Sequence, residues 1–87
     1  MALFLVTPIA DPGMTLAQIK EQFPDSHYEI PRTHSVFVVF KGTTKELSDK
    51  LGFVEKSIST GVVTAVSNYY GLAPTDMWEW IQSRMET

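Results

Sequence analysis

His27 and His34 are the only side chains in the sequence whose ordinary chemistry places a titration near neutral pH or offers an imidazole to a metal. They lie seven residues apart, on either side of Pro31, and no metal-ligand spacing relates them. We interpret them as exposed histidines of a hairpin. The acidic residues fall mostly at predicted helix caps and turns, and no pair is placed for acid–base catalysis. They include Asp11, Asp25, Glu29, Asp49, Asp76 and Glu79.

The sequence has no cysteine, which excludes disulfide bridges and thiolate metal sites. It also lacks a nucleophile elbow, a glycine loop of the phosphate-binding type and a zinc-binding motif. The residues alone therefore assign no catalytic group. We expect a protein without catalytic activity, without a cofactor and without a metal site.

The best places for a ligand or partner to touch are a polar segment after the last predicted strand and the predicted hairpin. In the first, an asparagine beside two tyrosines could contact a ligand, although such a segment more often ends a strand and packs. The candidate contact residues are Asn68, Tyr69 and Tyr70, with Arg32 and His34 of the hairpin.

Apolar runs and turn residues divide the chain into strands and helices. The segment before Pro31 is typical of an edge strand, because proline cannot donate to a central ladder. Two capping boxes, Thr15–Gln18 and Thr43–Glu46, predict helix starts, and Gly52 stands where a left-handed C-cap belongs. We expect strands over 2–6, 27–30, 35–40 and 62–70, and helices over 15–23, 43–51 and 76–85.

This order of elements predicts an α+β fold of the ferredoxin-like βαββαβ type, with an extra C-terminal helix. Right-handed crossovers give an antiparallel sheet of strand order 4-1-3-2, in which the first and third strands are central. These two strands carry the continuous apolar runs, so sequence pattern and topology agree. With 44% hydrophobic residues in a chain of 87, we expect one domain spanning residues 1–87.

The predicted central strands are apolar on both faces, although two helices cover only one face of such a sheet. In the first strand Phe4 and Leu5 point to opposite faces, as do Phe37 and Val38 in the third. The second face must therefore be covered by the last helix or by a second copy of the chain. We expect a homodimer, with interface residues Phe4, Phe37, Val39 and Trp80.

The place of Trp80 in this interface follows from helical phase. The apolar stripe of the last helix is made by Met77, Trp78, Ile81 and Met85. At 100° per residue, Trp80 lies about 115° from the centre of that stripe. Tryptophan is a favoured interface anchor, so we expect another surface to bury it; a solitary exposed ring is the alternative.

Charge and hydropathy restrict the partners. A net charge of -3 disfavours a broad nucleic-acid surface, and no apolar run approaches the roughly 20 residues of a membrane span. The apolar N-terminus lacks the basic residues of a secretion signal, which favours a strand and a cytoplasmic location. Among macromolecular partners, we therefore expect a protein rather than nucleic acid or a membrane.

The layout resembles that of the small CRISPR-associated ferredoxin-like adaptation nucleases and their degenerate relatives. The resemblance rests on the apolar strand 2–6, the hairpin segment 30–40 and the helix opened by Gly42–Leu47. It implies a dimer, and in the nuclease members a metal held by an aspartate just after the first strand. Here Thr7 and Pro8 follow that strand, and Asp11 is the nearest acid. A nuclease using Asp11 is therefore the alternative to a non-catalytic interaction module.

The strand and helix order is also similar to that of the RNA-recognition motif. Leu3-Phe4-Leu5 is similar to its first-strand motif and Phe37–Phe40 to the end of its third-strand motif. The resemblance implies weak RNA binding, with Phe4 and Phe37 stacking on bases at the open sheet face. Ser35 stands where the motif has a second aromatic residue, and buried strands produce the same pattern.

Overall fold

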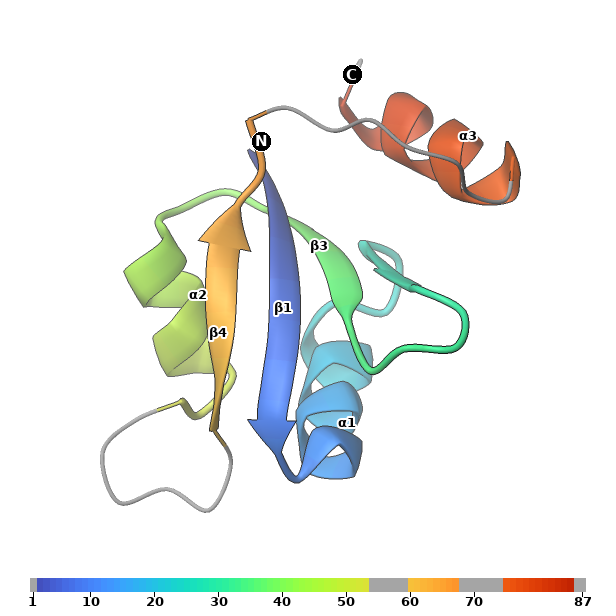
Figure 1. Ribbon diagram of the computed structural model, residues 1–87. Helices are drawn as coiled ribbons and strands as arrows, with labels where there is room; N and C mark the ends of the chain where they lie inside the picture. The colour runs from blue at the N-terminus through green and yellow to red at the C-terminus, as the bar shows by residue number, and fades with distance from the viewer. Residues whose placement is uncertain (1, 54–59, 68–74, 86–87) are drawn as a thin grey trace.

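The computed structural model describes residues 2–53, 60–67 and 75–85, with the side chain of Met85 left out. Four strands and three helices follow one another along the described chain, in the order strand, helix, strand, strand, helix, strand, helix (Figure 1). The strands are β1 (Ala2–Ala10), β2 (His27–Glu29), β3 (Val36–Phe40) and β4 (Thr60–Ala65). The helices are α1 (Pro12–Gln22), α2 (Thr44–Lys50) and α3 (Thr75–Met85).

The four strands form one antiparallel sheet in the order β2-β3-β1-β4, which confirms the predicted order and the α+β class. The central pair β1 and β3 aligns Leu3 with Val39 and Leu5 with Phe37. The apolar runs lie in these strands because both of their faces are packed, while the outer strands keep mixed residues.

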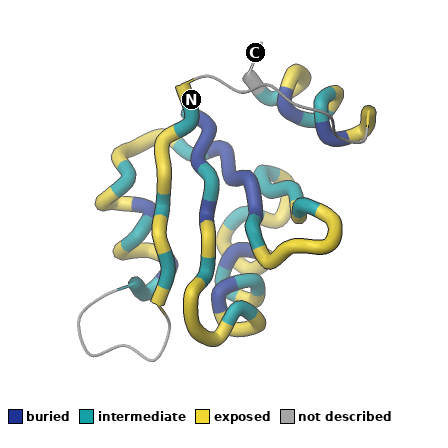
Figure 2. The backbone as a smooth tube through the Cα atoms, viewed as in Figure 1, coloured by how far each residue is buried: buried dark blue, intermediate teal, exposed yellow. Residues whose placement is uncertain are grey.

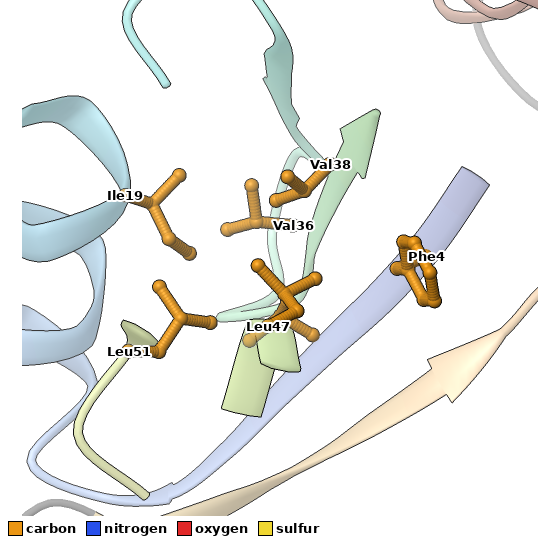
Figure 3. Close-up of a cluster of buried hydrophobic side chains, with 7 residues drawn as sticks. Phe4, Ile19, Val36, Val38, Leu47 and Leu51 are labelled. Atoms are coloured by element: carbon orange, nitrogen blue, oxygen red, sulfur yellow. The ribbon is translucent and has the colours of Figure 1, made fainter. Parts of the chain in front are cut away.

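One face of the sheet packs against α1 and α2; we call it the first face. Phe4, Val6, Val36 and Val38 reach it from the two central strands, and α1 and α2 add the remaining buried residues (Figure 3). From the helices these are Ile19, Leu47 and Leu51. This cluster is the main core of the protein.

The opposite face, which we call the second face, is partly covered by α3. Met77 and Ile81 of the helix pack with Leu3, Phe37 and Val39 in a second buried cluster. Figure 2 shows that α3, β1 and β3 each contain buried stretches. From the sequence, either the last helix or a second copy of the chain could cover the second face. Over this part of the face, the structure has the chain's own last helix.

The helix starts agree with the sequence for α2 and differ for α1. The capping box of α2 is present: Glu46 N–H donates to the Thr43 hydroxyl, and Thr43 N–H donates to the Glu46 carboxylate, each at 3.1 Å. The predicted cap at Thr15 is wrong, since this side chain is buried inside α1. Asp11 caps the helix instead, because Pro12 needs no N–H partner in the first turn.

Strand ends also differ from the predicted ones. β1 runs past Val6 to Ala10, through Pro8, with a register shift between Pro8 and Ala10. The strand tolerates this proline because Val6, paired with Val36, is the last residue of β1 aligned with β3. The N–H that Pro8 lacks would point to the β3 side of β1, where no residue of β3 is paired with Pro8. β4 ends at Ala65, and the rest of its predicted length includes residues 68–70, which lie outside the described residues.

Candidate interaction surface

The residues predicted to form the interface do not share one surface. Phe4 is only 2% exposed and lies on the first face, beneath the helices. The prediction that it meets a partner is therefore corrected: Phe4 is a core residue. Phe37 and Val39 do lie on the second face, but Met77 and Ile81 of α3 cover them.

The RNA-recognition arrangement needs Phe4 and Phe37 side by side on an open face. The register aligns Phe4 with Val38, and Phe37 with Leu5, so the two phenylalanines lie on opposite faces. Phe4 packs against Phe40 within the first cluster, with ring centroids 6.1 Å apart. This pair of rings therefore cannot stack on neighbouring bases from one surface.

Trp80 packs at the border of α3 and the sheet. Its ring lies 5.7 Å from that of Tyr28 of β2, and the Arg84 guanidinium lies 5.9 Å from its centroid. Arg84 also donates through Nε and Nη2 to the Asp25 carbonyl, at 3.1 and 2.7 Å. Trp80 is thus half-buried by contacts within its own chain. An additional interface role for this ring stays a prediction.

A second polar contact joins α3 to the edge of the sheet. The Tyr28 hydroxyl donates to Oδ2 of Asp76 at 2.6 Å. This hydrogen bond, helped by partial removal from water and by the carboxylate charge, raises the pKa of Tyr28 above its ordinary value of 10. Because the pKa is raised, the contact's contribution to stability is present below pH 10 and is lost as the pH rises through the raised pKa of Tyr28.

Of the predicted hairpin residues, Arg32 and His34 are exposed, whereas His27 is half-buried, so the prediction of two exposed histidines is correct only for His34. Arg32 adopts a left-handed backbone conformation (φ 65°) at the tip, with His34 exposed beside it. His27 lies in β2, where its Nδ1 is 2.6 Å from the Phe23 carbonyl oxygen. The structure therefore gives the two histidines separate surroundings. The other candidate contact residues, Asn68, Tyr69 and Tyr70, lie outside the described residues.

Asp11, the residue of the nuclease alternative, has a structural task. Its carboxylate accepts a hydrogen bond from Met14 N–H at 3.2 Å, and its backbone is left-handed (φ 52°). Within residues 2–53, 60–67 and 75–85, no group of three or more His, Asp or Glu side chains is arranged to hold a metal ion. The geometry thus assigns Asp11 to capping α1.

Replacing Asp11 tests this assignment. Asp11→Ala is expected to lower the free energy of unfolding by about 1–2 kcal/mol, through loss of the cap and strain at a left-handed position. Asp11→Asn keeps both features and is expected to stay near wild type in urea denaturation. If Asp11 instead held a catalytic metal, Mn²⁺ would raise the melting temperature of the wild type, and Asp11→Asn would abolish that rise.

The large exposed hydrophobic side chains gather at one end of the sheet. Ile9, near the end of β1, is 70% exposed, and Val62, at the start of β4, is 50% exposed. Met14, in the first turn of α1, is 40% exposed. Thr7 is aligned with Val62 across the two strands, and half-buried Leu5 follows on the same face. We call these residues, Leu5, Thr7 and Val62, together with Ile9 at the register shift beyond them, the open patch.

The sequence reasoning missed the open patch for a definite reason. It treated the second face as one surface, covered as a whole or open as a whole. α3 covers the half that contains Leu3 and Val39, and leaves Val62 uncovered. The signal that could have revealed this was the length of β1, whose apolar residue Ile9 lies beyond the predicted end at Val6.

None of the described helices is both long and apolar enough to pass through a membrane. No protein-family model, no curated protein and no solved structure matches this chain.

Proposed function

We propose that the protein is a non-catalytic interaction module that associates with a second copy of itself through the open patch. The observation that supports this most directly is the exposure of Ile9 and Val62 on neighbouring strands. Single exposed hydrophobic residues are ordinary, whereas neighbouring ones on a sheet mark surfaces that meet a partner.

The chemistry of the described side chains agrees with a binding role. Asp11 serves as a helix cap, and the histidines lie apart from any set of metal ligands among the described residues. The open patch carries no charged side chain, so two copies can meet there without like-charge repulsion.

Sedimentation across the micromolar range tests the proposal. We expect about twice the chain mass for the wild type, because burial of the open patch favours the dimer. Val62→Lys places a charge in the patch and is expected to weaken association by at least about tenfold, the effect of roughly 1.4 kcal/mol. Ala17→Lys adds the same charge at an exposed position of α1 and is expected to leave association unchanged.

A wild type that stays monomeric throughout this range would contradict the proposal. So would equal association of the Val62→Lys and wild-type proteins, since the patch would then play no part in it. Circular dichroism on each variant checks that the fold is retained.

A further inference from the structure

β4 is an end strand of the sheet, and its outer side faces no other strand among the described residues (Figure 1). Val66 N–H donates to the Leu3 carbonyl at 2.9 Å, which fixes the alternation of hydrogen-bonded pairs between β4 and β1. By that alternation, Val62 and Thr64 direct their backbone groups to β1. The N–H and C=O groups of Gly61, Val63 and Ala65 therefore point outward.

The two edges of the sheet differ in how they are protected. The opposite edge strand, β2, has three residues, with Glu29 in an ion pair with Lys20 (3.8 Å) and a proline shortly after its end. Short length, charge and proline are the usual means of keeping an edge from pairing. β4 has six residues, Thr60–Ala65, and contains no charge and no proline.

We propose that the outer edge of β4 pairs with the same edge of a second copy, antiparallel and about a twofold axis, so that two four-stranded sheets become one. This deepens the proposed self-association by assigning its geometry. The register that uses all outward backbone groups sets Val63 opposite the partner's Val63 and Gly61 opposite the partner's Ala65. Each outward N–H then meets an outward carbonyl.

A second copy suits this edge for two reasons. Antiparallel pairing about a twofold axis at Val63 lets the outward groups of Gly61 meet those of the partner's Ala65, so every outward group of β4 is used. The strand is also neutral, so its two copies do not repel one another.

The two faces of the sheet differ beside β4. On the first face, α2 packs through Leu47 and Leu51. On the second face, Val62 would lie opposite the partner's Thr64, which extends the open patch across the twofold axis. Edge pairing alone is a small contact, and burial of the half-exposed Val62 adds apolar area to it.

Proline substitution separates the outward from the inward hydrogen bonds of β4. Ala65→Pro removes an outward N–H at an exposed residue and leaves the bonds from Val62 and Thr64 to β1 intact. We expect this variant to keep its fold and to dimerise at least about tenfold more weakly in sedimentation. The matched control is Glu29→Pro, which removes an outward N–H from the β2 edge and is expected to leave dimerisation unchanged.

Amide hydrogen exchange on the unmodified chain gives a second measurement that does not depend on the folding of a variant. The amides of Val63 and Ala65 should exchange at least about tenfold more slowly as concentration rises through the dimer range, while the outward amide of Glu29 stays constant. A dimer that loses affinity in Val62→Lys but shows neither effect at the β4 edge would overturn edge pairing and leave the proposed function standing. A monomeric wild type would overturn both.

Discussion

Phe4→Ala is expected to lower the free energy of unfolding by about 3–5 kcal/mol, which is a large share of the roughly 4–13 kcal/mol available to a chain of 87 residues. Phe4 reaches the first face from the central strand β1 and packs there with Phe40 and with residues of both flanking helices. Truncation to alanine leaves a cavity in the middle of the main core. The neighbouring strands are held by the sheet and cannot close around it.

Urea denaturation followed by circular dichroism measures this effect, and two controls sharpen it. Phe4→Leu keeps most of the apolar volume and is expected to be markedly less destabilising than Phe4→Ala. Ile9→Ala truncates an apolar residue of the same strand that is largely exposed, so, measured below the dimer concentration range, it should change the free energy of unfolding little. If Phe4→Ala were as stable as the wild type but failed to associate, Phe4 would be an interface residue and not a core residue.

The order of the strands could be predicted because it rests on two independent signals. Apolar runs mark Leu3–Val6 and Val36–Val39 as buried on both sides, and right-handed crossovers put those same strands in the centre. The cap at Thr43 could be predicted for a related reason, since Glu46 completes a reciprocal pair of hydrogen bonds within four residues of sequence.

The start of α1 could not be predicted from the same motif, because Thr15–Gln18 matches a capping box by sequence alone. The competing start at Asp11 needs a left-handed aspartate before Pro12, a conformation that residue type permits but does not require. The interface assignment of Phe4 failed for a different reason. Alternation separates the two faces within each strand, but only the register shows that Phe4 and Phe37 lie on opposite faces, and only tertiary structure shows which face each helix covers.

A second large loss of stability is expected from truncation of Ile81, which holds α3 against the second face. Ile81 is fully buried and, with Met77, packs against Leu3 and Phe37. The polar contacts of α3, such as Tyr28 to Asp76, lie at its exposed border, where water competes for the same groups. Docking of the helix therefore depends mainly on its two buried apolar residues.

Ile81→Ala should consequently lower the free energy of unfolding by about 2–5 kcal/mol, unless α3 can leave the sheet while the main core stays folded. In that case the loss is limited to the free energy of docking, and urea denaturation separates into two transitions. Released α3 would uncover Leu3, Phe37 and Val39, so binding of a hydrophobic dye would rise before the sheet unfolds. Glu79→Ala, an exposed substitution in the same helix, is the control, and it should neither split the unfolding transition nor raise dye binding.

A single transition at the wild-type midpoint for Ile81→Ala would show that α3 is not held by its buried side chains. The second face would then need another cover, and the homodimer predicted through Phe37 and Val39 would again be the arrangement to test.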